Sequence, residues 1–265
     1  MIKQSLHVHS TYDDGVSTME EMVLSAIENG LSSMGFSGHS YLSFGEDWTM
    51  TPEETSLYCD DIDRLRAEYP CIAIYRGIEL DTFSDMPEGS FQYIIGSCHN
   101  VAVNGHIISV DESKEGLIAG IDEYFGGDSQ AFARAFFDET ARIRKADIQG
   151  HFDLLTKFNE DGEIFDEKDY FEYCLPVMHK AVSLGRIFEI NTGAVSRGYR
   201  SMPYPSERLL KALREMGGKI TITADCHNAA DIAFGYEEAG EYAKSCGFEK
   251  IWILTDSGFA EEKIR

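Results

Sequence analysis

The segment Leu6-His7-Val8-His9 closes the first apolar run of the chain, and the rest of the sequence is best understood outward from it. Side chains of an extended segment alternate between two faces, so His7 and His9 point in the same direction. Imidazole is the commonest metal ligand among protein side chains near neutral pH. The pair therefore predicts one half of a metal site at the end of a first strand.

More side chains of the same chemical kind follow later apolar runs. The ends of the predicted strands carry His39, Glu79, His99, His151, Glu189, Asp225 and His227. In a barrel of parallel strands these ends converge on one face, so the residues would share one pocket. Hydrolytic metal sites need such a set of imidazole and carboxylate ligands, with positions left open for water. By contrast, His106 follows a turn and His179 lies within a predicted helix, so we expect both to be structural or surface residues.

Short apolar segments alternate with helical patterns along the chain. We expect strands over 2–7, 33–37, 71–80, 92–97, 186–190, 219–224 and 251–254, with a short segment over 147–150 that leads into His151. We expect helices over 18–29, 51–69, 129–145, 167–184, 205–216 and 229–245. This alternation predicts a mostly parallel sheet, and about seven strand–helix units favour a closed or nearly closed barrel. An open doubly wound sheet is the alternative, but it would collect ligands at one switch point.

The length favours one domain over residues 1–265. Residues 101–127 contain Asn104-Gly105, a good hairpin turn, and then acidic and glycine-rich sequence. We expect this segment to be an insertion or a lid.

Composition excludes several classes of protein. The chain has 46 acidic against 23 basic residues, a net charge of −23, which disfavours nucleic acid as a partner. None of the six cysteines forms a Cys-x-x-Cys pair, the first residues lack a signal-peptide core, and no apolar run approaches the roughly 20 residues that span a bilayer. We expect a cytoplasmic protein with reduced thiols and no membrane partner. The oligomeric state is left open.

The order of these residues resembles that of the PHP (polymerase and histidinol phosphatase) family, from His7 to His227. The motifs that carry the resemblance are Gly96-Ser97-Cys98-His99, Gly150-His151-Phe152-Asp153, Glu189-Ile190-Asn191-Thr192 and Ala224-Asp225-Cys226-His227. They look most like those of the free-standing histidinol-phosphate phosphatases. That resemblance implies an α/β fold, a distorted (β/α)7 TIM-like barrel, with three divalent metal ions at the C-terminal ends of its strands. Residues 101–127 match no family motif.

The resemblance also implies three sets of metal ligands, which are His7, His9, Glu79 and Asp225 for the first ion, Glu79, His99 and His151 for the second, and Asp14, His39 and His227 for the third. Spacing alone does not choose between Asp13 and Asp14, and the family pattern adds Asp14. Glu189 is a candidate ligand because of its position after a strand, and the resemblance does not include it. Alternatively, Glu189 orients another ligand or contacts the substrate. Because the set contains no cysteine, it suits Zn, Mn or Fe without choosing among them.

A phosphate monoester needs a cationic partner beside the metals. Arg197 and Arg200 follow the predicted strand 186–190, and we favour Arg197, which lies between a serine and a glycine. Asp225 and His227 are the candidate proton donors to the leaving oxygen. The expected activity is hydrolysis of a small phosphate monoester, L-histidinol phosphate in histidine biosynthesis. The alternatives are another small substrate such as a nucleotide or phosphotyrosine, a 3′–5′ exonuclease, and a non-catalytic metal-binding module.

Overall fold

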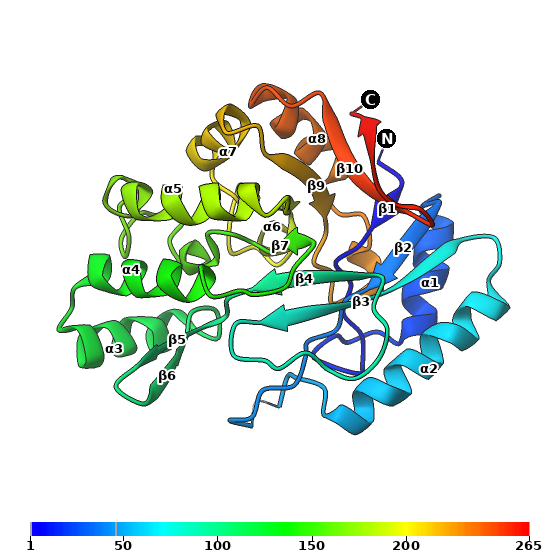
Figure 1. The fold of residues 1–265 in the computed structure, drawn as a ribbon, viewed down its shortest axis with the longest axis horizontal. Coiled ribbons are helices and arrows are strands. Elements are labelled where there is room, and N and C mark those ends of the chain that lie inside the picture. Colours follow the sequence, from blue (N-terminus) through cyan, green and yellow to red (C-terminus); the bar gives the residue numbers. More distant parts are fainter. Residues whose placement is uncertain (1, 46, 265) are drawn as a thin grey trace.

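A sheet of seven parallel strands forms the centre of the computed structural model, which describes residues 2–45 and 47–264 (Figure 1). In spatial order the strands are β1 (Gln4–Ser5), β2 (Ser33–Phe36), β3 (Ala73–Asp81), β4 (Tyr93–Ser97), β7 (Ile148–Gln149), β8 (Ile187–Asn191) and β9 (Lys219–Thr223). Every pair in this order is parallel. Neighbours in space follow one another along the chain, as in a barrel rather than in a doubly wound sheet.

The first and last strands approach each other just beyond their ends. Val8 and Cys226 form a parallel bridge, in which the amide of His9 donates to the carbonyl of Cys226 at 3.0 Å. The amide of Cys226 donates in turn to the carbonyl of His7 at 3.3 Å. The sheet is therefore a nearly closed barrel, and the predicted distorted (β/α)7 fold is confirmed.

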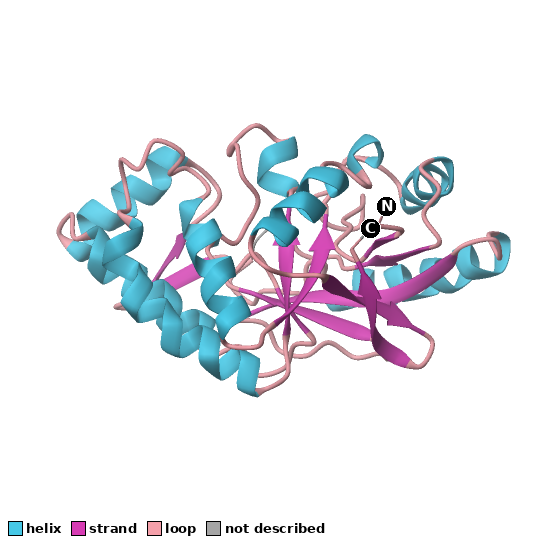
Figure 2. Cartoon of the chain, turned by 90° about the horizontal axis from the view of Figure 1, so that it is seen from above, coloured by secondary structure: helices cyan, strands magenta, loops and turns pink. Residues whose placement is uncertain are grey.

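Helices flank the strands on several sides of the molecule (Figure 2). They are α1 (Met19–Glu28), α2 (Pro52–Glu68), α3 (Lys114–Phe125), α4 (Ser129–Thr140), α5 (Glu167–Ser183), α6 (Gly193–Ser196), α7 (Glu207–Glu215) and α8 (Tyr236–Ser245), with 3-10 turns at Leu154–Thr156 and Ala229–Asp231. The predicted start of α2 is confirmed, because Thr51 caps it reciprocally with Glu54 and Pro52 occupies its first position. Across the described residues, no helix combines the length and the apolar character that crossing a bilayer requires.

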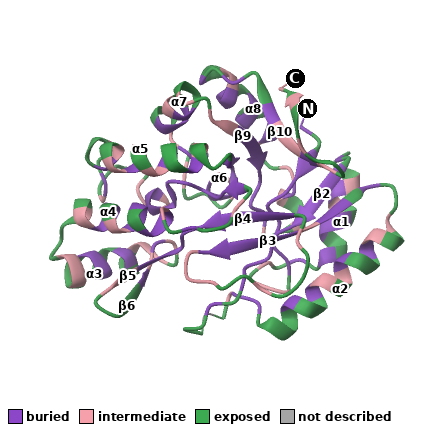
Figure 3. Cartoon of the chain, in the orientation of Figure 1, coloured by how far each residue is buried: buried purple, intermediate pink, exposed green. Residues whose placement is uncertain are grey.

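Tyr93 fills the interior of the barrel. Its hydroxyl donates to the carbonyls of Leu6 at 2.6 Å and Phe36 at 3.0 Å, and its ring lies against Gly35 and Gly77. A Cβ on Gly77 would come within 2.2 Å of that ring, so these positions have no room for a side chain. The seven barrel strands are buried along most of their length, whereas the outer faces of the helices are exposed (Figure 3). The metal-binding candidates thus stand on a rigid, closely packed base.

The C-terminal segment differs from the prediction. The helix expected over 229–245 is wrong in its first part, because Gly235 adopts a left-handed backbone (φ +68°) before α8 begins at Tyr236. The strand expected over 251–254 exists as β10 (Lys250–Thr255), but it pairs antiparallel with β11 (Gly258–Lys263) and not with the barrel sheet. The side chain of Gln4 ties β10 to β1, since it donates to the carbonyl of Leu254 at 2.8 Å and accepts from its amide at 2.7 Å.

Residues 101–127 fold as a hairpin followed by a helix. β5 (Asn100–Val103) pairs with β6 (His106–Ser109) across the predicted Asn104-Gly105 turn, and α3 covers the hairpin. His106 is exposed on this hairpin, as expected. Helix α4 ends at Thr140, five residues before its predicted end.

Candidate metal centre

The barrel brings all nine predicted metal ligands together at the carboxyl ends of its strands. They are His7, His9, Asp14, His39, Glu79, His99, His151, Asp225 and His227. Their donor atoms form four overlapping groups, each within 4.8 Å, and Glu79 belongs to two of them. Residues far apart in the sequence thus share one cluster, as the positions after the strands predict.

Glu79 occupies the middle of this cluster. One carboxylate oxygen, Oε2, lies 3.1 Å from Nε2 of His7 and 3.5 Å from Nε2 of His9. The other, Oε1, lies 3.0 Å from Nε2 of His151 and 3.4 Å from Nε2 of His99. Glu79 therefore faces two sets of imidazoles with two different oxygens, which is the arrangement of a bridging carboxylate.

Ser97 fixes the position of Glu79 within the centre. Its hydroxyl donates to Oε1 of Glu79 at 2.5 Å. Gly150 lies directly against this hydroxyl, because a Cβ at that position would come within 2.1 Å of Oγ of Ser97. The glycine before His151 thus leaves the space that the serine needs.

Three buried polar atoms of the cluster lie close together but form no hydrogen bonds with one another. Nε2 of His7, Nε2 of His9 and Oε2 of Glu79 are inaccessible to solvent, and among the described residues none of them finds a hydrogen-bond partner. Leaving such atoms unpaired costs about 1–3 kcal/mol each. A divalent cation between them would remove this cost, so the residues present fit a bound metal.

Asp225 adds a carboxylate to the same place. Its Oδ1 lies 3.3 Å from Nε2 of His9 and 3.6 Å from Nε2 of His7. Asp225 adopts a left-handed backbone (φ +47°), which is uncommon outside glycine and concentrates at functional sites.

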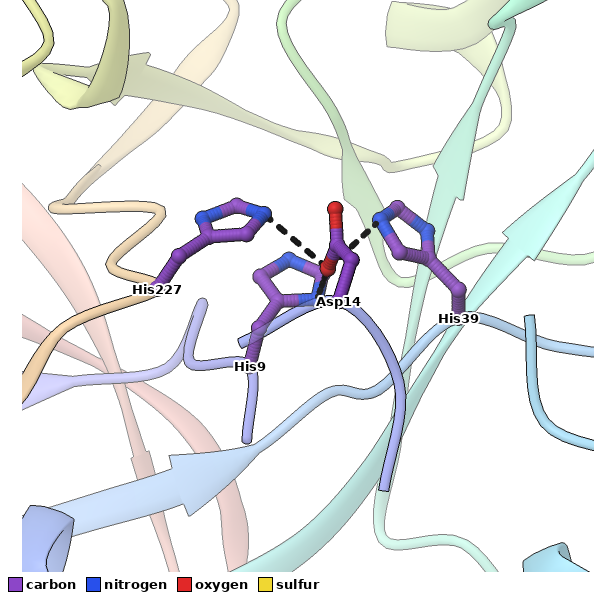
Figure 4. A group of neighbouring side chains, drawn as sticks. All are labelled: His9, Asp14, His39 and His227. Carbon is purple, nitrogen blue, oxygen red and sulfur yellow. Dashed lines mark ion pairs between the residues drawn. The ribbon is translucent and has the colours of Figure 1, made fainter. Parts of the chain in front are cut away.

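Asp14 lies among the histidines on a second side of the cluster (Figure 4). Its Oδ1 lies 3.2 Å from Nε2 of His227 and 3.7 Å from Nε2 of His39. Asp13 points elsewhere, since its Oδ2 lies 2.5 Å from Nδ1 of His9 and accepts the amide of His39 at 3.0 Å. The geometry thus distinguishes Asp13 from Asp14, which the sequence spacing does not. Asp13 orients histidines, whereas Asp14 faces the candidate metal site.

Two more carboxylates hold the far nitrogen of a candidate ligand. Oε2 of Glu189 lies 2.8 Å from Nδ1 of His7, and Oδ2 of Asp81 lies 3.1 Å from Nδ1 of His99. Such partners fix the tautomer and leave Nε2 for a metal. Of the possible roles of Glu189, the contacts favour orienting a ligand. Asp13 and Asp81 were not predicted, although Asp81 follows Glu79 by two positions on one strand, which places both side chains on the same face.

The density of charge shifts the pKa values of the cluster. Burial alone lowers the pKa of His9, but the adjacent carboxylate of Asp13 outweighs it and raises the pKa to about 10. Burial lowers the pKa of His39 to about 4, despite the attraction of Glu79. Burial raises the pKa of Glu79, but His7, His39 and His99 hold it well below its ordinary value. Glu79 is therefore ionised, and binding of divalent ions would displace protons from imidazoles such as that of His9.

Arg197 lies at the edge of this centre. Its Nη1 donates to the carbonyl of Asp225 at 2.9 Å and lies 2.8 Å from Nδ1 of His227, and its Nη2 lies 3.4 Å from Oδ2 of Asp225. Arg200 turns away, donating to the carbonyl of Thr156 at 3.3 Å. Of the two candidate arginines, only Arg197 contacts the predicted ligands.

Comparisons with known proteins agree with this geometry. The family model for the PHP domain matches residues 5–193. The chain is 29% identical to a Schizosaccharomyces pombe protein named "Probable histidinol-phosphatase", over 89% of this chain and 83% of that protein. It is 24% identical to the "DNA polymerase/3'-5' exonuclease PolX" of Bacillus subtilis, over 86% of this chain and 34% of that protein.

Among solved structures, the fold is similar to histidinol phosphate phosphatase from Lactococcus lactis, crystallised with zinc, L-histidinol and phosphate. The TM-score is 0.75 at 20% identity, covering 97% of this chain and 98% of that one. The family match spans well over half of the sequence and includes seven of the nine predicted ligands. The chain therefore belongs to the PHP domain family.

Proposed function

We propose that this chain is a metal-dependent phosphomonoesterase that hydrolyses L-histidinol phosphate to L-histidinol and phosphate. The observation that carries the proposal is the convergence of nine imidazole and carboxylate side chains around Glu79. Sites of this composition hold divalent metals in hydrolases. The similarity to histidinol-phosphatases from S. pombe and L. lactis supports the choice of substrate.

Three divalent ions would occupy the cluster. We assign His7, His9, Glu79 and Asp225 to the first, Glu79, His99 and His151 to the second, and Asp14, His39 and His227 to the third. His9 also lies near Asp14, but its Nδ1 is held by Asp13, so only its Nε2 is available, and that atom faces Asp225. The separate contacts of the two oxygens of Glu79 support its role as the bridge.

Imidazole and carboxylate donors suit Zn, Mn or Fe. Bound there, such ions supply Lewis-acid polarisation of the phosphate and a water of lowered pKa. Cysteine does not contribute: the thiols of Cys98 and Cys226 lie near the ligands in sequence, but burial raises the pKa of both, which keeps them protonated.

Arg197 would bind phosphate oxygens beside the metals. With Nε2 of His227 on a metal, the neutral ring carries its proton on Nδ1, which then donates to the carbonyl of Asp225 at 3.0 Å. In that state Nδ1 no longer accepts from Arg197, so an N–H of the guanidinium is released. The Arg197 side chain is 29% exposed, which leaves it accessible to a ligand.

The leaving alkoxide must take up a proton. Asp225 and His227 are the two candidates, because both lie against Arg197 at the accessible side of the cluster. Although burial raises it, His7 and Arg197 hold the pKa of Asp225 well below its ordinary value, so Asp225 would relay a proton from the attacking water. The side chains of Asp225 and His227 are 7% and 21% exposed, so His227 is the more open of the two.

An assay of the purified protein against a panel of phosphate monoesters tests this function. The panel contains L-histidinol phosphate, a mononucleotide, phosphotyrosine and p-nitrophenyl phosphate, each with and without added Mn or Zn. We expect the highest kcat/KM for L-histidinol phosphate and loss of turnover after chelation. A preference for another monoester, or turnover without metal, would contradict the proposal.

A 3′–5′ exonuclease is the second candidate, favoured by the similarity to the B. subtilis polymerase and exonuclease. The net charge of −23 opposes it, because a strongly acidic surface repels a polyanionic strand. Release of mononucleotides from a labelled oligonucleotide at a rate matching that for L-histidinol phosphate would support it.

A further inference from the structure

Asp111 places a carboxylate beside the metal centre that belongs to none of the three ligand sets. It follows β6, and the amide of the preceding residue, Val110, donates to the carbonyl of His99 at 2.9 Å. The hairpin of residues 100–109 is thereby tied to the strand end that carries His99. Although burial raises it, Lys157 lowers the pKa of Asp111, and so do His99 and His151. Asp111 therefore lies beside the strand end that carries His99.

The partners of this carboxylate hold it loosely. Nζ of Lys157 donates to the backbone carbonyl of Asp111 at 2.7 Å but lies 3.4 Å from Oδ2. Oγ of Ser109 lies 3.4 Å from Oδ1. The Asp111 side chain is 27% exposed, whereas those of Glu79 and Asp225 are 0% and 7% exposed. A carboxylate offers about four acceptor sites, so Asp111 retains capacity for a further donor.

The other carboxylates described in the cluster are already engaged. Glu79, Asp14 and Asp225 face the imidazoles that would share metals with them. Asp13, Asp81 and Glu189 each hold the far nitrogen of a histidine. Burial raises the pKa of Asp111, but Lys157 outweighs it, so this accessible carboxylate is ionised at neutral pH.

We infer that Asp111 binds the ammonium group of the substrate and selects phosphate monoesters whose tail carries a cation. This inference rests on the proposed function and deepens it. With phosphate held between the metals and Arg197, the organic tail leaves the cluster past His99, where Asp111 lies. An ammonium there gains a charge-assisted hydrogen bond. A carboxylate or a second phosphate in the tail meets repulsion, and the neutral nucleoside of a mononucleotide gains no such bond.

The test compares two substrates that differ only in the amine, L-histidinol phosphate and 3-(imidazol-4-yl)propyl phosphate. The wild type should prefer the aminated substrate. In Asp111→Asn the ratio of the two kcat/KM values should fall about 10-fold, mainly through KM for the aminated substrate, because a hydrogen bond to a charged group is lost at a partly exposed site. Glu112→Gln, which removes the neighbouring exposed carboxylate, should keep the wild-type ratio.

Metal content separates recognition from a structural role. Asp111→Asn should retain the metal content of the wild type in elemental analysis. If the ratio of the two kcat/KM values in Asp111→Asn equals that of the wild type, because neither substrate or both substrates equally lose activity, the inference is overturned. If the wild type hydrolyses neither imidazole compound, the proposed function fails, and O-phosphoethanolamine and ethyl phosphate then replace them as substrates or competitive inhibitors. Equal kinetic constants for that second pair would overturn the role of Asp111 independently.

Discussion

Glu189 connects two candidate ligands of the metal centre, because its Oε2 lies 2.8 Å from Nδ1 of His7 while its Oε1 accepts the amide of His151 at 2.6 Å. Thr223 and Asn191 donate to the same carboxylate at 2.9 and 2.8 Å, so the buried Glu189 side chain is itself held in place. With a metal on Nε2, His7 would thus keep its remaining proton on Nδ1, against Glu189.

Glu189→Gln should therefore lower metal affinity by about 10- to 100-fold, because the orientation of His7 is lost although no ligand is removed. Competition with a chromogenic chelator measures the affinity. Glu207→Gln, which changes an exposed carboxylate on α7 paired with Lys211, is the matched control and should bind metal as the wild type does. Unchanged affinity in Glu189→Gln would show that the contact does not orient His7.

Glu79→Gln should disrupt two ligand sets at once. The variant keeps the size of the side chain but loses the charge that lies between His7 on one side and His151 on the other. We expect metal content to fall at both positions and activity to drop by orders of magnitude, while circular dichroism shows a folded protein. Near-normal turnover with full metal content would rule out the bridge.

Arg197→Ala should separate phosphate binding from metal binding. A charge-assisted hydrogen bond is worth roughly 1.5–3 kcal/mol, so kcat/KM should fall at least about 10-fold, with metal content preserved. A loss confined to KM would mean that Arg197 contacts phosphate equally in the ground and transition states, and a loss in kcat that it meets charge developing during transfer.

Arg200→Ala is the control on the same segment, since Arg200 donates to Thr156 and lies over the ring of Tyr204. It should leave kcat/KM for L-histidinol phosphate close to the wild-type value. Normal kinetics in Arg197→Ala together with a large defect in Arg200→Ala would move the phosphate contact to Arg200.

Gln4→Ala should destabilise the fold at a distance from the metals. The substitution leaves the buried amide and carbonyl of Leu254 without the Gln4 side chain and also removes a contact with Ser33. Unsatisfied buried groups cost about 1–3 kcal/mol each, so the free energy of unfolding should fall by about 2–4 kcal/mol. Urea unfolding of the metal-saturated protein measures it. Gln130→Ala, on the exposed face of α4, should change it by less than about 0.5 kcal/mol.

The sequence predicted most of the barrel, because short apolar strands alternate with capped helices and each strand end carries a polar ligand. The start of the helix at residue 51 and the hairpin turn at Asn104-Gly105 were predicted from local sequence, and both are confirmed. The assignment of residues 1–265 to one domain stays a prediction.

What the sequence could not predict depends on contacts between distant residues. β10 resembles a further barrel strand locally, yet it pairs with β11, and the side chain of Gln4 links it to β1. Asp13 and Asp14 are equivalent in composition, and only the folded turn directs one at His9 and the other at His227. The role of Asp81 needs the pairing of β3 with β4, which brings it beside His99.

The number of divalent ions bound per chain tests the central claim most directly. Elemental analysis of the saturated protein, combined with anomalous scattering from its crystals, should find more than two ions per chain. Two of the sites should share Glu79, and the third should include Asp14. A single ion held only by His7 and His9 would contradict the account.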